Sequence, residues 1–209
     1  MYSVKEIYFT FQGEGYHTGR PAVFCRFSGC NLWSGREEDR ANAVCKFCDT
    51  DFWGTDGVEG GKYSLEKLVE KCEQIWNKEF DQQPYIVFTG GEPALQLDEA
   101  LIKALHAKNF EIAIETNGTL ALPEDIDWIC MSPKANTELV VKKGNELKLI
   151  YPQTGIDPKD VEHFDFEHYY LQPMDSPTQA ENTMEVVKYC NLNPKWRISI
   201  QTHKLLNIP

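Results

Sequence analysis

Three cysteines, Cys30, Cys45 and Cys48, lie in one polar segment that contains no fourth cysteine. A structural metal site is closed by four protein ligands, whereas a catalytic site keeps one position open for a small molecule. Cys45 and Cys48 have two residues between them, so both thiolates can bind one metal centre from a single turn. The position of Cys30 depends on the fold of the charged stretch 31–44, which reads as an insertion loop. These thiols predict a metal centre with an open ligand position.

A glycine pair further along the chain could form a pocket beside that centre. Tyr85–Thr89 is rich in β-forming residues and leads into Gly90, Gly91 and Glu92. Glycine lacks Cβ, so backbone groups there can approach a ligand closely. An ordinary turn at the end of a strand is the alternative interpretation. A three-thiolate iron–sulfur cluster beside a backbone-lined pocket is the arrangement that binds S-adenosylmethionine and cleaves it reductively.

A zinc site completed by Cys25 is the alternative to a cluster. Cys25 alternates with Val23 and Phe27 in a β pattern, which points it towards the core, where cysteine behaves as a small hydrophobic residue. The chain has seven cysteines, an odd number that does not suit a disulfide framework. We favour the cluster over zinc, chiefly because the motifs further along the chain agree with it.

Composition limits the class of protein. The chain has 209 residues, 42% of them hydrophobic and 25% charged, which suits a single globular domain. Its net charge of −11 argues against a surface that binds nucleic acid or anionic membranes, because such binding needs clustered Lys and Arg. No apolar run reaches transmembrane length, and the first residues lack the features of a signal peptide. We expect a cytoplasmic protein.

Strand and helix patterns alternate along the chain, which is typical of parallel βα units. Polar motifs follow most of the predicted strands, and the carboxyl ends of parallel strands meet at one edge, so these motifs should converge. We predict helices at Leu65–Lys78, with Ser64 as N-cap, at Asp98–Lys108 and at Gln179–Tyr189. Strands are predicted at Val4–Phe9, Ala22–Phe27, Tyr85–Thr89, Glu111–Glu115, Trp128–Met131, Glu146–Ile150, Tyr169–Gln172 and Arg197–Thr202.

The cysteines, taken with the TGGEP run at 89–93, resemble the radical S-adenosylmethionine superfamily. Most members space the cysteines three and then two residues apart, so the long first gap is a departure. That gap and seven further motifs resemble one subset of the 7-carboxy-7-deazaguanine synthases over nearly the whole chain. The motifs are FQGEG at 11–15, CRFSGCNLW at 25–33, CDT at 48–50, ETNG at 115–118, SPK at 132–134, QPMD at 172–175 and the final QTHKLLNIP.

The resemblance implies a partial, reduced version of the superfamily's α/β barrel, formed by residues 1–209 as one domain with a modified cluster-binding loop at 28–50. It also implies a homodimer, an electron donor of the flavodoxin type and a radical mechanism. The implied reaction is the ring contraction of 6-carboxy-5,6,7,8-tetrahydropterin to 7-carboxy-7-deazaguanine and ammonia, a step towards queuosine and related 7-deazapurines.

The resemblance assigns most motif residues to cofactors. Cys30, Cys45 and Cys48 would hold a 4Fe–4S cluster, and Thr50 would contact Mg²⁺, although a helix cap is the simpler interpretation of that threonine. Glu92 could offer charge or orientation to the methionine part of S-adenosylmethionine. Glu115 and Asn117 could assist, although an Asn-Gly pair is commonly just a turn. The residues expected to bind S-adenosylmethionine are Phe47, Cys48, Asp49, Gly91, Ser132, Pro133, Lys134, Gln172, Pro173, Met174 and Asp175.

The pterin substrate needs hydrogen-bonding partners for its ring and a cation for its carboxylate. Arg26 suits a carboxylate, because a guanidinium can bind it through two hydrogen bonds. Gln12 and Glu14 lie in a glycine-flanked turn and can pair with ring N–H and carbonyl groups; solvated turn residues are the alternative. We interpret His203 as a structural residue. The expected substrate-binding residues are Phe11, Gln12, Gly13, Glu14, Arg26, Thr89 and Pro209, the last through its α-carboxylate.

Two other functions remain open from the sequence. A radical-generating activase that acts on a glycine of a partner protein would have a similar size, but it would need an open docking groove. A zinc-stabilised interaction module would be colourless and free of iron and sulfide.

Overall fold

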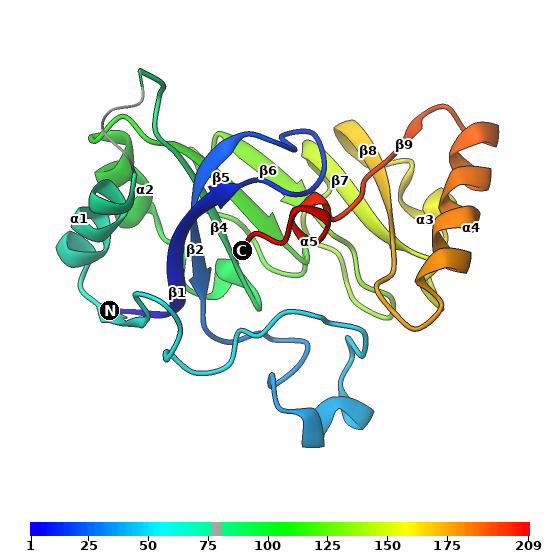
Figure 1. Ribbon diagram of the computed structural model, residues 1–209, viewed down its shortest axis with the longest axis horizontal. Helices are drawn as coiled ribbons and strands as arrows, with labels where there is room; N and C mark the ends of the chain where they lie inside the picture. The colour runs from blue at the N-terminus through cyan, green and yellow to red at the C-terminus, as the bar shows by residue number, and fades with distance from the viewer. Residues whose placement is uncertain (77–80) are drawn as a thin grey trace.

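The computed structural model describes residues 1–76 and 81–209, which form one open nine-stranded sheet in the order β3-β1-β2-β4-β5-β6-β7-β8-β9 (Figure 1). The strands from β2 to β9 in this order are parallel, whereas β1 is antiparallel to both β2 and β3. The bounds are β1 Tyr2–Phe11, β2 Pro21–Phe27, β3 Gly61–Tyr63, β4 Tyr85–Gly90, β5 Glu111–Thr116, β6 Trp128–Met131, β7 Lys143–Tyr151, β8 Asp165–Pro173 and β9 Trp196–Ile198.

The first two strands depart from the parallel pattern that the sequence predicted. Residues 12–20 form the whole connection between β1 and β2, and a parallel crossover takes a dozen or more residues. The short link therefore imposes an antiparallel pair. The strand β3 was not predicted; it covers the edge of β1 with three residues. The predicted strand Arg197–Thr202 is wrong beyond Ile198, where the chain leaves the sheet.

The three predicted helices agree with the structure in place but differ in length, and the short helices α3 and α5 were not predicted. The side chain of Ser64 accepts a hydrogen bond from Lys67 N–H and caps α1, and Asp98 caps α2 through Leu101 N–H. The last part of the predicted helix Leu65–Lys78, residues 77 and 78, lies outside the described residues. The helices are α1 Leu65–Ile75, α2 Glu99–His106, α3 Pro158–Val161, α4 Gln179–Leu192 and α5 Thr202–Leu206, with 3₁₀ turns η1 Glu37–Asn42 and η2 Pro93–Leu95.

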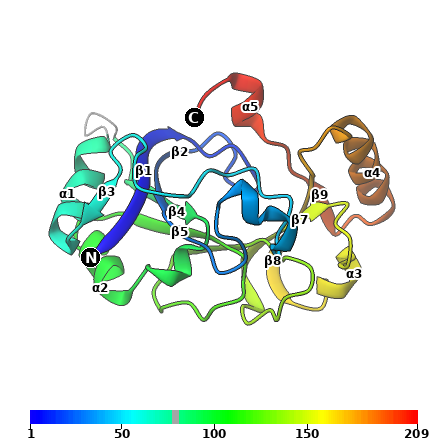
Figure 2. The same cartoon turned by 90° about the horizontal axis from the view of Figure 1, so that it is seen from below.

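Two apolar cores lie between the sheet and its helices. The larger core joins β1, β2, β4 and β5 to α1 and α2, and the smaller joins β7, β8 and β9 to α4. Figures 1 and 2 show α1 and α2 at one end of the molecule, α3 and α4 at the other, and α5 with the C-terminus between them. Among the described residues, no helix is both long and apolar enough to cross a membrane.

The alternation of side chains along β2 places Cys25 on the face of the sheet opposite to the cavity. Cys25 of β2 is fully buried in the larger core, where it neighbours Cys72 of α1. The next residue, Arg26, points to the opposite face of the sheet and lines a cavity there. Cys25 therefore cannot act as the fourth ligand of a zinc site with the other three cysteines.

Candidate functional site

A cavity of about 400 Å³ lies on the inner face of the sheet. This volume is within the usual range of small-molecule sites, roughly 300–1,000 Å³. Its wall is formed by β1 and β2 with the turn between them, by the loop at 28–50 that carries the cysteines (the cysteine loop), by β7 and the ends of β4, β5, β6 and β8, and by the C-terminal segment, residues 199–209. Figure 2 shows the end of the C-terminal segment near β1 and β2.

The cysteine loop meets the cavity through two of its three thiols. Cys45 and Cys48 line it, and Cys30 lies just behind, where Leu32 N–H donates to its sulfur at 3.4 Å. Burial raises the pKa of the Cys30 and Cys48 thiols. A bound metal centre would reverse this effect, because a coordinating thiol loses its proton to the metal. None of the seven cysteines forms a disulfide.

Two glycines at the end of β4 allow the cysteine loop to pack there. A Cβ on Gly90, whose φ is +139°, would lie 2.2 Å from the carbonyl oxygen of Phe27. A Cβ on Gly91 would lie 2.3 Å from the carbonyl oxygen of Gly29 and 2.6 Å from Cys30 Cβ. Both contacts are too short for any residue but glycine, so this turn sets the position of Cys30.

Glu92 does not play the part that the sequence suggested. Its side chain is fully buried, and it accepts hydrogen bonds from Ala94 N–H at 2.9 Å, Thr116 Oγ1 at 2.8 Å and Asn117 N–H at 2.7 Å. The carboxyl group therefore ties the glycine turn to the ETNG loop. It does not line the cavity, so the expectation that Glu92 meets the methionine moiety is wrong.

A buried cation, Lys148 of β7, organises the floor of the cavity. Its Nζ lies 2.7 Å from Glu14 Oε2 and 2.9 Å from Glu115 Oε2, and Gln12 Nε2 donates to Glu115 at 3.1 Å. Burial alone would raise the pKa of Glu14, but Lys148 outweighs burial, together with hydrogen bonds from Gln201 and Gln172, and lowers that pKa to about 2. Glu14 is therefore a fixed anion.

Arg26 reaches the cavity already partly paired. Its Nε donates to Glu6 at 2.7 Å and its Nη2 donates to Tyr8 Oη at 2.9 Å. A guanidinium has five N–H donors, so these contacts fix its plane and leave donors for a ligand. Both the salt bridge and a role in binding are compatible with this geometry.

Most residues singled out from the sequence share the cavity. Pro133 does not line it; this residue is buried, and its carbonyl oxygen accepts from Gln153 Nε2 at 3.3 Å. Several further lining residues were not predicted, among them Lys148, Gln201 and Lys204. The expected site residues that line the cavity are Phe11, Gln12, Gly13, Glu14, Arg26, Cys45, Phe47, Cys48, Asp49, Thr50, Thr89, Gly91, Ser132, Lys134, Gln172, Pro173, Met174, Asp175 and Pro209, with Glu115, Asn117 and His203 beside them.

Comparisons with known proteins agree with this geometry. Residues 39–146 match the family model of the Radical SAM superfamily. The chain is 58% identical over 208 residues to the 7-carboxy-7-deazaguanine synthase of Bradyrhizobium diazoefficiens, covering 99% of each chain. It is 56% identical over 209 residues to that of Bordetella pertussis, covering 100% of this chain and 99% of the relative. The chain belongs to the 7-carboxy-7-deazaguanine synthases of the radical SAM superfamily.

A solved structure supports the same family assignment. The crystal structure of QueE from Escherichia coli superposes with a TM-score of 0.72 at 26% identity, covering 96% of this chain and 93% of that one. The predicted partial α/β barrel is thereby confirmed, with an open sheet. The match to the superfamily begins at residue 39, so it excludes Cys30. This boundary falls within the long gap between Cys30 and Cys45.

The residues present fit the cofactors of this superfamily, a 4Fe–4S cluster and S-adenosylmethionine. Three thiols without disulfide partners and a glycine-lined strand end adjoin one cavity. Over the described residues, no three His, Cys, Asp or Glu side chains gather closely enough to hold a single metal ion. A cubane cluster does not require the three thiols to meet at one point, since each cysteine binds a separate iron.

Proposed function

We infer that this chain converts 6-carboxy-5,6,7,8-tetrahydropterin to 7-carboxy-7-deazaguanine and ammonia; its relatives are named for the synthesis of that product. One observation carries this inference: a single cavity is lined both by the cysteine loop and by the FQGEG turn with the chain's C-terminus. The first set of residues suits a radical-generating cofactor, and the second offers paired polar groups to a flat heterocycle. The ring contraction needs both within one enclosure.

When bound, the cluster and S-adenosylmethionine would supply a 5′-deoxyadenosyl radical. We propose that Cys30, Cys45 and Cys48 hold the cluster. The predicted S-adenosylmethionine residues of the cysteine loop and of the ends of β4, β6 and β8 would hold the nucleoside, with the Lys134 ammonium near the thiols. That ammonium donates to Ser132 Oγ at 2.7 Å, which keeps it in place although burial lowers its pKa.

On the substrate side, this chain's residues would bind and orient the pterin. Glu14 and Gln12 are held by Lys148 and Glu115, so they present fixed acceptor and donor groups to the ring edge. Arg26 and Thr89 would meet the substrate carboxylate. The α-carboxylate of Pro209 would accept hydrogen bonds from the guanidine-like edge of the pterin, and Phe11 and the end of the chain would exclude water from the reacting atoms.

The direct test is turnover. The anaerobically reconstituted chain, given the pterin, S-adenosylmethionine and dithionite, is expected to release ammonia and 7-carboxy-7-deazaguanine. Cys45→Ala is the control and should yield neither. If the wild-type chain cleaves S-adenosylmethionine but forms no deazaguanine with any pterin, an activase that acts on a partner protein becomes the better interpretation.

We also propose that Thr50 binds Mg²⁺ together with the substrate carboxylate. Thr50 follows Asp49 at the cavity wall, and magnesium prefers oxygen ligands while keeping several waters. Titration of activity with magnesium should give a half-saturating concentration several-fold higher in Thr50→Ala than in wild type, while Thr50→Ser stays close to wild type. Equal magnesium dependence in all three proteins would exclude Thr50.

The assembly and the electron donor are further proposals. Exposed apolar side chains gather along β9 and α5, namely Ile198, Ile200, Leu205 and Leu206. They support burial in a homodimer, which sedimentation equilibrium would detect.

The cysteine loop lies at the periphery of the molecule in Figure 1, which supports reduction by an external donor of the flavodoxin type. Replacing dithionite with reduced flavodoxin should sustain turnover.

We propose that residues 1–209 form one domain. All lining residues of the cavity belong either to the single continuous sheet or to segments that connect directly to its strands. A cytoplasmic location is supported by the seven unpaired thiols, since that compartment keeps cysteines reduced.

A further inference from the structure

The C-terminal segment crosses the cavity without a core of its own. Helix α5 has five residues, none of them buried, and Leu205 and Leu206 are 75% and 65% exposed. An isolated helix of this length is unstable in water, because its few hydrogen bonds do not offset the entropy of ordering it. Within a single chain, contacts with other segments therefore have to hold it in place.

Polar contacts at both ends of the C-terminal segment supply part of that support. Thr202 donates to the carbonyl oxygen of Gly13 through its N–H at 2.9 Å and its hydroxyl at 2.8 Å. At the far end, Thr10 Oγ1 donates to a main-chain oxygen of Pro209, part of its α-carboxylate, at 2.8 Å. Asn207 adopts a left-handed conformation, with φ of +52°, and turns the last residues back towards β1. These contacts join the segment to the substrate side of the cavity.

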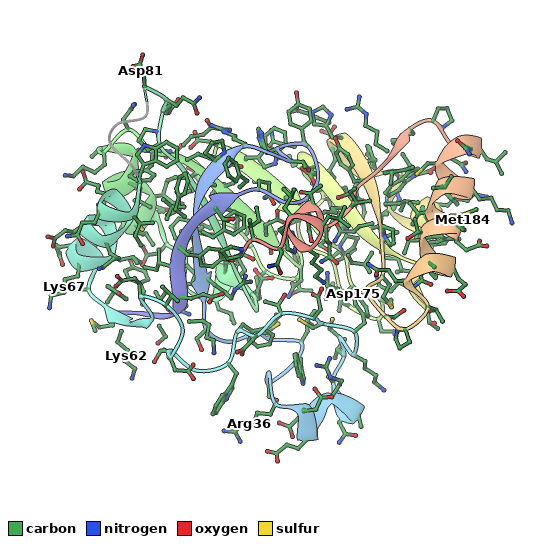
Figure 3. All side chains as sticks on the ribbon, in the orientation of Figure 1. Arg36, Lys62, Lys67, Asp81, Asp175 and Met184 are labelled. Atoms are coloured by element: carbon green, nitrogen blue, oxygen red, sulfur yellow. The ribbon has the colours of Figure 1, made fainter. Side chains whose placement is uncertain are left out.

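One lysine joins the same segment to the cofactor side. Lys204 Nζ lies 2.7 Å from Asp49 Oδ2 and 2.5 Å from Asp175 Oδ2. Asp49 directly follows Cys48, and Asp175 ends the QPMD motif after β8; Figure 3 labels Asp175 close to α5. A single ammonium thus connects three parts of the chain that are far apart in sequence.

A glutamine strengthens the connection. Gln201 Nε2 donates to Asp49 Oδ2 at 3.2 Å and to Glu14 Oε1 at 3.0 Å. The contacts therefore run without a break from Asp175 through Lys204, Asp49 and Gln201 to Glu14. Because Glu14 also pairs with Lys148, the chain's end is linked to the floor of the cavity as well as to its cofactor wall.

We propose that Lys204 is a positioning residue that latches the C-terminal segment onto the cysteine loop, so that the end of the chain is ordered over the cavity before substrate binds. If the segment is already ordered, the free energy of substrate binding does not include the entropic cost of ordering it. The latch itself can be tested without turnover; its kinetic consequence rests on the proposed function.

The first test is amide hydrogen exchange of the anaerobically reconstituted full-length chain, with oligomeric state checked for each variant. In Lys204→Met, amides of residues 202–208 should exchange about five- to tenfold faster than in wild type, because two ion pairs are lost. Lys204→Arg should restore most of the protection. Lys103→Met, which removes the exposed Lys103–Glu99 pair of α2, is the matched control and should leave this segment unchanged.

The second test separates KM from kcat. Lys204→Met should raise the KM for the pterin about five- to tenfold while kcat changes less than about twofold, and Lys204→Arg should recover the KM. Unchanged exchange in Lys204→Met would overturn the latch, as would equally fast exchange in the arginine variant. Faster exchange with wild-type kinetics would overturn the positioning role. A wild-type chain without deazaguanine synthesis would refute the proposed function, while the exchange result would still decide the latch.

Discussion

Two opposing effects, burial and the nearby Lys148, act on the pKa of Glu146. Its side chain is buried, Oε2 accepts from Tyr16 N–H at 3.1 Å, and Oε1 has no hydrogen-bond partner among the described residues. Burial raises the pKa of Glu146 to about 7, although Lys148 acts in the opposite direction. The group is thus half-protonated near neutral pH, and its charge is costly in the folded state.

This pKa predicts a pH-dependent stability that glutamine would remove. The raised pKa favours the folded state below pH 4.5, and the advantage is lost as pH rises towards 7, because only the unfolded state releases the proton. Between pH 5.5 and 8, Glu146→Gln should gain about 2 kcal/mol in free energy of unfolding relative to wild type. Urea unfolding at both pH values measures this. The exposed control Glu124→Gln should follow wild type, and a parallel profile in Glu146→Gln would contradict the assignment.

The site residues differ in how far sequence could predict them. Gln12, Glu14 and Arg26 could be found, because a glycine-flanked turn and a strand alternation place them. Lys148 carried an unused signal: a lysine alternating with Leu147 and Leu149 in a buried strand must face a polar interior. Lys204 lies in the final QTHKLLNIP motif, but its partners could not be predicted, since they lie 155 and 29 residues away along the chain.

At the scale of elements, the turn after β4 sets the cysteine loop. Gly91→Ala places a methyl group against the Gly29 carbonyl and Cys30 Cβ, both closer than 3 Å, so the loop must shift. We expect iron and sulfide content after anaerobic reconstitution to fall several-fold, while the circular dichroism spectrum stays native, because both cores lie on the other face of the sheet. Cys45→Ala provides the reference for lost iron. Full iron content in Gly91→Ala would show that the loop tolerates the methyl group.

Element boundaries were predictable where local chemistry determines them. Ser64 and Asp98 begin α1 and α2 because their side chains cap the first turns. The predicted strand Arg197–Thr202 failed because a strand needs a partner along its length. The last hydrogen bond of the main chain to β8 runs from Ser199 N–H to Leu171 at 2.9 Å, and the hydroxyl of Ser199 is bonded to Gln172 and to Gly15 N–H. Those partners come from distant segments, so the local pattern could not reveal where the chain leaves the sheet.

The whole molecule is an open sheet with a cavity that its own C-terminus covers. The two cores lie against the outer helices, and the inner face carries polar residues from β1, β5, β7 and β8. An open sheet leaves this polar face accessible to water unless another segment covers it. Residues 199–209 lie between the two ends of the molecule in both Figure 1 and Figure 2. Stability and enclosure are thus supplied by different parts of the chain.

Removal of residues 207–209 should separate these two properties. The deleted residues include no buried side chain, so the thermal midpoint should change by no more than about 3 °C and iron content should stay at the wild-type level. Turnover of the pterin should fall at least about 100-fold, because Thr10 loses its partner at Pro209 and the reacting atoms become open to water. Scanning calorimetry, iron analysis and deazaguanine formation measure the three quantities. Pro209→Ala keeps the chain length and the terminal carboxylate, so it should retain most activity. A truncated chain that turns over as fast as wild type would mean that the cavity works uncovered.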